Sequence, residues 1–106
     1  MDQKKIRQPI KTFLDRIKRD ISIDKVILFG SVADGKATGS NDIDVLVISK
    51  DFKRWNEDRR LTLLYDISKF IKPEIHPWGI TPEELSTASR LTTIGFARDH
   101  GITLLT

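Results

Sequence analysis

Cysteine is absent from the 106-residue sequence, which excludes a disulfide framework and a metal site built from thiolates. No apolar run is long enough to cross a bilayer, and the first residues lack the pattern of a signal peptide. The sequence also lacks internal repeats, low-complexity tracts and Pro/Ser-rich linkers. We therefore expect a soluble, cytoplasmic protein that folds as a single domain over residues 1–106.

The net charge is small, because 18 Lys and Arg residues oppose 15 Asp and Glu residues and leave a formal charge of +3. This bias permits an anionic ligand. The pI of about 9.3 keeps a nucleic-acid-binding module open as an alternative. The basic residues are scattered over helix faces that we expect to be solvated, which weakens that alternative. Hydrophobic residues make up 39% of the chain and are spread along it, which excludes global disorder.

The N-terminal segment has apolar residues at helical spacing with charged residues between them, which predicts an amphipathic helix. Proline is tolerated better in the first turn of a helix than in its middle. Pro9 therefore predicts that the regular helix begins near Gln8. The apolar residues of this stripe are Ile6, Ile10, Phe13, Leu14, Ile17 and Ile21.

Four short apolar runs are typical of strands. Residues 25–29 and 43–48 read as buried strands on either side of a segment rich in turn-forming residues. Residues 74–78 form a third strand candidate, and residues 102–105 a short last one. Pro77 cannot donate a hydrogen bond to a neighbouring strand, so we expect it at a sheet edge or a strand end.

Three further helices are predicted. A long one begins between Lys53 and Asp58 and stops before Pro73. Residues 81–84, Thr-Pro-Glu-Glu, have the pattern of a capping box that starts a short helix, and a further helix spans residues 91–99. This order of elements predicts an α/β (α+β) domain with a small mixed β-sheet flanked by helices.

Two aspartates, Asp42 and Asp44, lie at the start of the second buried strand. Side chains alternate along a strand, so both carboxylates point to one face, with Cα atoms about 6.5–7 Å apart. Two carboxylates this close repel each other, and a divalent cation such as Mg²⁺ would relieve the repulsion. The alternative is an exposed strand start, with Asp42 as a turn residue and Asp44 solvated, which is the commoner explanation of an arbitrary Asp-x-Asp.

Gly30 and Ser31 follow the first buried strand directly and favour a ligand-binding interpretation. Backbone N–H groups at such a turn can hold a phosphate, glycine lets the ligand approach closely, and the Ser31 hydroxyl adds a donor. A phosphate-binding turn and a pair of metal-binding carboxylates on adjacent strands are together much stronger evidence of a ligand site than the Gly-Ser pair alone.

The pattern Gly30-Ser31-x10-Asp42-x-Asp44, between two apolar strands, resembles the nucleotidyltransferase superfamily that includes DNA polymerase beta. The small size is similar to that of the minimal nucleotidyltransferases, the MNT or MntA-like antitoxins. This resemblance covers nearly the whole chain and implies the polymerase beta-like fold. It also implies a third carboxylate on a neighbouring strand, which we assign to Glu74 in Pro73-Glu74-Ile75-His76.

The resemblance further implies that Asp42, Asp44 and Glu74 are the catalytic residues and the metal ligands, binding two Mg²⁺ ions that bridge them to nucleotide phosphates. Glu74 would also help accept the proton of the attacking hydroxyl, unless it is only a surface residue. Alternation places His76 and Trp78 on the face of Glu74. A single histidine is more often a packing residue than a ligand, and Trp78 could stack on a base or simply pack.

Gly30, Ser31 and Lys36 are the expected nucleotide-binding residues. One departure from the family pattern is clear. Relatives often have arginines just after the Gly-Ser pair, where this chain has Val32 and Asp34, and Lys36 is the nearest cation. The contacts that bind the triphosphate are therefore expected to differ from those of the relatives.

The resemblance implies transfer of AMP from ATP to a protein acceptor. Minimal nucleotidyltransferases are typically encoded with a HEPN-domain protein, so we expect an antitoxin that adenylylates a HEPN-type ribonuclease toxin within a hetero-oligomer. The alternative is a binding-only antitoxin with weak or no transferase activity. We expect no direct contact with membranes or nucleic acid.

Overall fold

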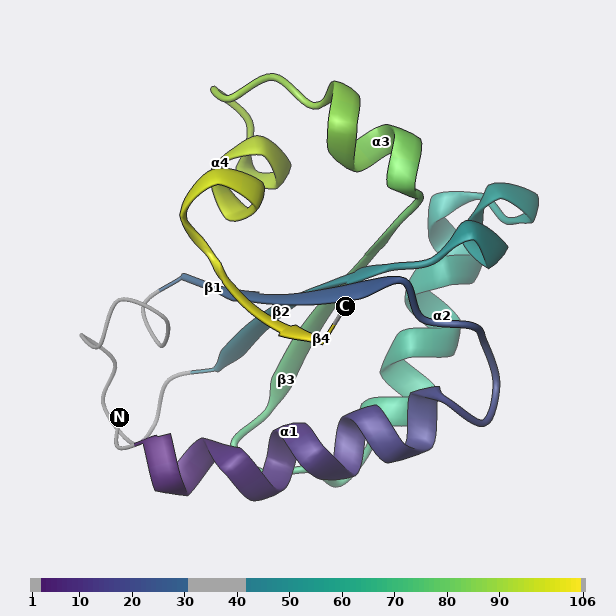
Figure 1. Cartoon of the computed structure of the whole chain (residues 1–106). Helices are drawn as coiled ribbons and strands as arrows, with labels where there is room; N and C mark the ends of the chain where they lie inside the picture. The colour runs from purple at the N-terminus through teal and green to yellow at the C-terminus, as the bar shows by residue number, and fades with distance from the viewer. Residues whose placement is uncertain (1–2, 31–41, 106) are drawn as a thin grey trace.

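The protein is described here by a computed structural model, which covers residues 3–30 and 42–105. Its sheet lies between two layers of helices (Figure 1). One face is covered by α1 (Gln3–Ile17) and α2 (Glu57–Ser68), and the other by α3 (Pro82–Thr87) and α4 (Thr93–His100). None of the helices in these ranges has the length and apolar character needed to cross a membrane.

The mixed sheet has the strand order β3-β2-β1-β4. Strand β1 (Lys25–Phe29) pairs antiparallel with both β2 (Ile43–Ile48) and β4 (Ile102–Leu105), while β2 pairs parallel with β3 (Ile75–Ile80). The predicted bounds of β1, β2 and β4 are confirmed. The third strand begins one residue later than predicted and extends to Ile80, and it is an edge strand, as Pro77 indicated.

The central strands are buried on both faces, which explains their nearly continuous apolar sequences. Alternate side chains enter two cores, one on each side of the sheet. The core under α1 and α2 includes Ile43, Val45, Val47 and Ile75, together with Phe13 and Leu64. The core under α3 and α4 includes Ile27, Phe29, Leu46, Ile48, Leu85 and Ala97.

The predicted start of the first helix is wrong. Helix α1 begins at Gln3, five residues before Gln8, so Pro9 lies inside it and is buried. Proline removes one backbone hydrogen bond from the helix. Most helix stability in proteins comes from packing of the apolar face, and Ile6, Ile10 and Phe13 are buried on either side of Pro9. Tertiary packing therefore overrides the local preference.

A short 3₁₀-helix, η1 (Lys50–Arg54), was not predicted from the sequence. The Ser49 hydroxyl caps it by accepting a hydrogen bond of 3.0 Å from the Asp51 N–H. The helix places Phe52 in the core, where its side chain is 0% exposed. One buried aromatic ring thus fixes the connection between β2 and α2.

Arg60 on α2 is the buried cation that joins this region together. Its Nε donates to the carbonyls of Phe52 and Trp55, both at 3.0 Å. Its Nη1 donates to the Gly79 carbonyl at 3.2 Å and to Glu84 Oε1 at 2.7 Å. Four segments, η1, α2, β3 and α3, are therefore held together by one guanidinium group.

The predicted capping box at the start of α3 is confirmed. The Thr81 hydroxyl accepts from the Glu84 N–H at 3.1 Å, and Glu84 Oε1 accepts from the Thr81 N–H at 2.7 Å. Burial acts to raise the pKa of Glu84, but the hydrogen bonds from Thr81 and Arg60 prevail and hold it below its ordinary value.

Candidate active site

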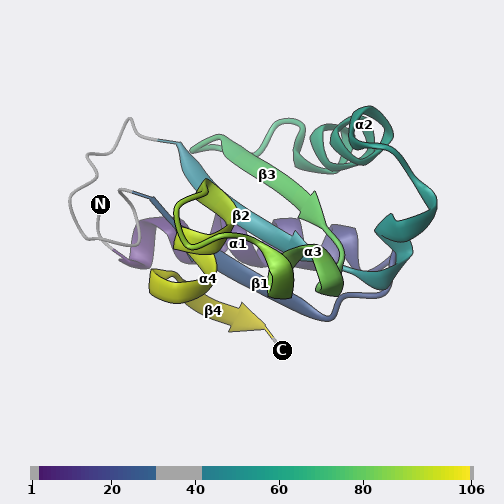
Figure 2. The ribbon, with the colours of Figure 1, turned by 90° about the horizontal axis from the view of Figure 1, so that it is seen from above.

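Four polar residues lie at one end of the sheet, where β1 ends and β2 and β3 begin. Figure 2 shows these strand ends side by side. Asp42 and Glu74 immediately precede β2 and β3, and Asp44 and His76 are the second residues of these strands. The parallel register pairs Asp44 with His76, and the Ile43 N–H donates to the Glu74 carbonyl at 2.8 Å. The neighbours of Asp44 in β2 enter the core under α1 and α2, so Asp44 faces the side of α3 and α4.

His76 lies at the centre of the group. Its Nε2 is 3.1 Å from Asp42 Oδ2 and 3.9 Å from Glu74 Oε2. One ligand atom from each of these three residues lies within 4.8 Å of the others. The side chains are between 42% and 58% exposed, so a bound substrate could reach them. The second Glu74 oxygen, Oε1, is 3.2 Å from Lys72 Nζ, a cation that the sequence reading missed although it lies only two residues away.

Asp44 is the most enclosed acid of the site. Burial raises the pKa of its carboxyl, the electrostatic interaction with His76 lowers it, and the negative charge of Asp42 raises it further, so that the net shift is upward. A carboxyl group that resists ionisation beside a second carboxylate is typical of a functional site.

Gly30 is required at this position for a reason that the sequence did not reveal. Its backbone φ is +79°, a left-handed conformation that glycine adopts readily. A Cβ atom on Gly30 would lie 2.5 Å from Asp44 Oδ2. The glycine therefore allows the backbone just after β1, at Gly30 itself, to lie directly against the carboxylate of Asp44.

The structure brings together Asp42 and Glu74, two of the three predicted metal ligands, and adds His76 to them. Asp44 lies beside this group as the register partner of His76, but none of its oxygens belongs to it. The remaining predicted nucleotide-binding residues, Ser31 and Lys36, lie outside the described residues. The same holds for Val32 and Asp34, where relatives often have arginines.

The donors of this group fit a divalent cation. Carboxylate oxygens suit Mg²⁺ and Mn²⁺, and a neutral imidazole nitrogen is a common ligand of transition metals. Asp42, Glu74 and His76 would hold the ion, and partial exposure leaves room for phosphate oxygens to complete its coordination.

Trp78 lies two residues beyond His76 on the same face of β3. Its ring is 41% exposed and contacts Phe29 edge-on, with the ring centroids 6.2 Å apart. It also borders a hollow of about 220 Å³ between β3, α2 and the helices above the sheet, together with Ile80 and Ile94. The packing role is thus visible, while stacking on a base stays a prediction.

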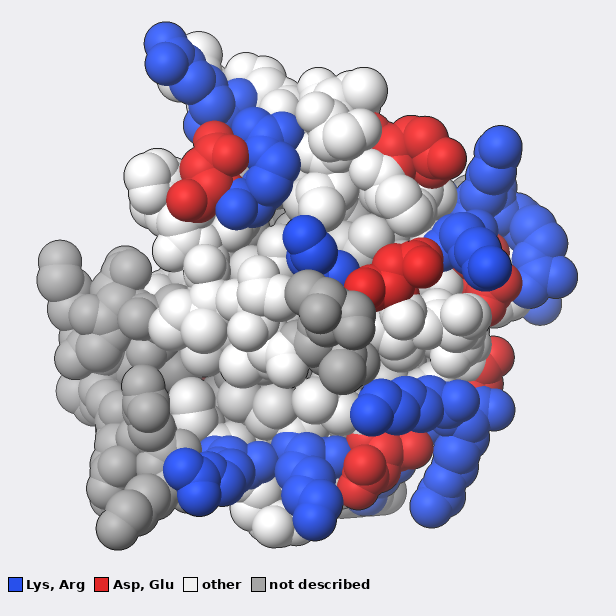
Figure 3. All heavy atoms as spheres, in the orientation of Figure 1, with Lys and Arg blue, Asp and Glu red and all other residues white. Residues whose placement is uncertain are grey.

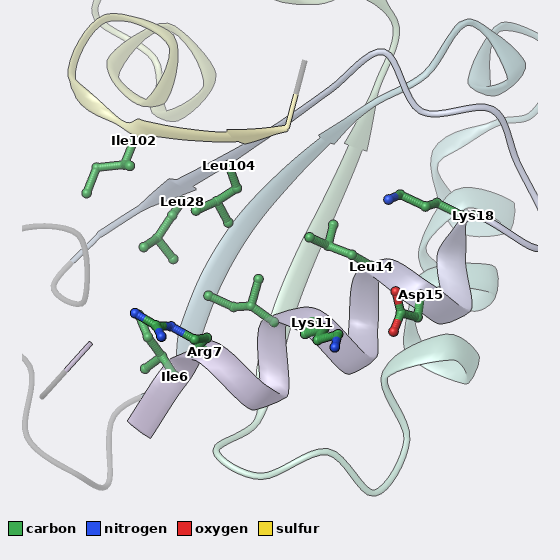
Figure 4. Close-up of a pocket in the computed structure, with 10 residues that line it drawn as sticks. Ile6, Arg7, Lys11, Leu14, Asp15, Lys18, Leu28, Ile102 and Leu104 are labelled. Atoms are coloured by element: carbon green, nitrogen blue, oxygen red, sulfur yellow. The ribbon is translucent and has the colours of Figure 1, made fainter. Parts of the chain in front are cut away.

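A larger hollow lies on the opposite face, away from the carboxylates. It is a groove of about 430 Å³ between α1 and β4, bordered by Ile6, Leu14, Leu28 and Leu104 (Figure 4). Basic side chains gather along the edge of the molecule formed by α1 (Figure 3). The residues that border this groove include neither Asp42, Glu74 nor His76, so it is not the candidate active site.

Comparison with known proteins agrees with this geometry. The family described as Nucleotidyltransferase domain matches residues 10–98. A protein of Methanocaldococcus jannaschii, named "Putative protein adenylyltransferase MJ1305", is 34% identical over 94 residues, which are 84% of this chain and 64% of that protein. The chain therefore spans less than two thirds of that relative.

A crystal structure from Sulfolobus solfataricus, described as that of a "putative nucleotidyltransferase", superposes with a TM-score of 0.58 at 20% identity. The superposition covers 99% of this chain and 97% of the Sulfolobus solfataricus chain. The likeness supports the fold. The predicted polymerase beta-like nucleotidyltransferase fold is confirmed. The chain belongs to the nucleotidyltransferase domain family.

Proposed function

We propose that this protein transfers AMP from ATP to a hydroxyl group of a protein acceptor. The observation on which this rests is the group of Asp42, Glu74 and His76 beside Asp44, at the end of the sheet where the family motif begins. The relative from Methanocaldococcus jannaschii, whose name describes a protein adenylyltransferase, supports a protein acceptor.

In the proposed reaction, the acceptor oxygen forms a bond to the α-phosphorus of ATP, and the bond from that phosphorus to the bridging oxygen breaks and releases pyrophosphate. The acceptor proton passes to a carboxylate, for which Glu74 is the candidate because it is exposed. Asp42 would orient the phosphates through a divalent cation, for which Mg²⁺ is the first ion to test. When bound, such a cation stabilises negative charge on the attacking and leaving oxygens.

The proposed acceptor is a HEPN-type ribonuclease toxin, with this chain as its antitoxin in a hetero-oligomer. The support is the resemblance of the Gly-Ser and Asp-x-Asp motif to the minimal nucleotidyltransferases. The second candidate is an antitoxin that inhibits its partner by binding alone. Val32 and Asp34 favour this candidate, because they stand where relatives often have arginines.

Incorporation of label from α-labelled ATP tests the proposal. The purified protein is incubated with Mg²⁺ and ATP, with and without the protein encoded next to it. Label on the neighbour that disappears in the Asp42→Ala/Asp44→Ala variant is the expected result. Asp66→Ala removes an exposed acid on α2 and serves as the matched control, which should retain full labelling.

Two results would contradict the proposal. Labelling that persists in the Asp42→Ala/Asp44→Ala variant would place the chemistry elsewhere. No labelling, together with tight binding and inhibition of the neighbour, would establish the binding-only antitoxin.

A further inference from the structure

His76 is the member of the group to which the family resemblance assigns no role. The geometry points to His76 as a direct metal ligand that makes this site select Mn²⁺ over Mg²⁺. The inference concerns how the chain binds its cation. It uses the family's need for a divalent ion but not the identity of the acceptor or of the nucleotide.

The distances between the donor atoms are close to those around one octahedral ion. Ligands bound at about 2.1–2.2 Å on neighbouring vertices of an octahedron lie about 3.0 Å apart, and those on opposite vertices about 4.3 Å apart. His76 Nε2 is 3.1 Å from Asp42 Oδ2, close to the spacing of neighbouring vertices, and 3.9 Å from Glu74 Oε2, which lies between the two spacings. All three donor atoms therefore reach one ion after small side-chain movements.

The backbone holds the three donors in this arrangement. Asp42 and Glu74 stand at the starts of two parallel strands that are joined by the hydrogen bond from Ile43 to Glu74. His76 lies two residues after Glu74, and side chains alternate along a strand, so His76 lies on the same face of the sheet as Asp42 and Glu74. The imidazole therefore lies on this face because of the register, and no loop has to close to bring it there.

The chemistry of the donors decides the selectivity. Mg²⁺ prefers oxygen ligands in nearly ideal octahedral geometry, whereas first-row transition metals also accept imidazole nitrogen. Two carboxylates alone would bind both ions. A nitrogen ligand adds affinity for Mn²⁺ and little for Mg²⁺, so the ratio of the two dissociation constants measures the contribution of His76.

The competing explanation is that His76 only pairs with Asp42 and orients it. In that case, removal of the imidazole changes the affinity for Mg²⁺ and Mn²⁺ by similar factors, because both ions then lose the same oriented oxygen. The ratio of dissociation constants would stay constant. A direct ligand and an orienting partner therefore give different results in one measurement.

Titration calorimetry with MgCl₂ and with MnCl₂, in the absence of nucleotide, provides the test. For His76→Asn, which offers an oxygen in place of the nitrogen, we expect the preference for Mn²⁺ over Mg²⁺ to fall by at least about tenfold. The matched control is His100→Asn. His100 is the other histidine of the chain, lies at the end of α4 and packs against Phe96, so the preference should not change.

Pulsed electron paramagnetic resonance of Mn²⁺ bound to the unmodified protein gives a second test that needs no variant. A nitrogen-14 coupling typical of a bound imidazole is expected, and it should remain in His100→Asn. Absence of this coupling, or an unchanged preference in His76→Asn, would overturn the inference. Because neither measurement involves transfer, a failure of the proposed adenylylation leaves both readouts interpretable.

Discussion

The contact between Gly30 and Asp44 leads to a prediction that can be worked out from the structure. In Gly30→Ala, the residue must keep a φ of +79°, which costs a residue with a Cβ about 1–2 kcal/mol. The new Cβ would also lie 2.5 Å from Asp44 Oδ2, and relief of such a contact costs about 1–3 kcal/mol. We expect Gly30→Ala to lower the free energy of unfolding by about 2–5 kcal/mol.

A double-mutant cycle separates the two contributions. Asp44→Ala removes the carboxylate and leaves only the Asp44 Cβ position, 3.5 Å from the added methyl, which is an ordinary contact. In the Asp44→Ala background, Gly30→Ala should cost only the backbone part, about 1–2 kcal/mol. The expected coupling energy between the two sites is therefore about 1–3 kcal/mol.

Urea unfolding followed by the fluorescence of Trp55 and Trp78 measures all four proteins of the cycle. Equal losses from Gly30→Ala in both backgrounds would refute the reasoning, because the glycine would then be needed only for its backbone conformation. A reduced rate of label transfer in Gly30→Ala is also expected, since the Asp44 carboxylate must move.

Three further changes test other parts of the structure. Phe52→Ala should lower the free energy of unfolding by about 3–5 kcal/mol in urea, because its ring is 0% exposed, whereas Phe70→Ala removes a ring that is 94% exposed and should change it by less than about 0.5 kcal/mol. Glu84→Gln should destabilise the fold at neutral pH. Because the pKa of Glu84 is lowered in the folded state, the ionised carboxylate stabilises the fold above its ordinary pKa of 4.5. This stabilisation is lost as the pH falls through the pKa of the folded state. The free energies of unfolding of Glu84→Gln and of the wild type should therefore converge on acidification. Asp44→Asn should have the opposite effect. The pKa of Asp44 is raised in the folded state, so ionisation of this carboxyl destabilises the wild type as the pH rises above 3.8. The variant should therefore be more stable than the wild type at pH 7 but not at pH 3. A constant difference in the free energy of unfolding across this range would contradict the upward shift.

Much of the fold could be predicted because local signals agreed with the final packing. The apolar runs of β1 and β2 are bounded by turn residues, which predicts strands. The capping box at Thr81 is a local motif that predicts the start of a helix. The start of α1 could not be predicted. At Pro9 the local rule opposed the burial of the helix face, and burial prevailed. The 3₁₀-helix around Phe52 has no periodic pattern, and only its buried ring explains it.

The candidate site was predicted less completely than the fold. Asp42 and Glu74 were found from the motif, and their meeting is consistent with it. The proximity of His76 to Asp42 depends on the parallel pairing of β2 with β3, two strands separated by η1 and α2, and such a register cannot be read from local sequence. The positions after Gly30 that the family pattern singles out lie outside the described residues.

The edge position of β3 has a consequence for how the activity responds to stress. Two of the three residues of the group, Glu74 and His76, depend on an edge strand, which pairs only with β2 in the described sheet. Opening of edge elements commonly requires less free energy than global unfolding, and amide hydrogen exchange should show β3 opening before β1, which is paired on both sides. When β3 separates from β2, Asp42 and Glu74 move apart while most of the domain stays folded. The free energy of pairing this one strand, rather than that of unfolding the whole domain, therefore sets the limit of activity under mild denaturing conditions.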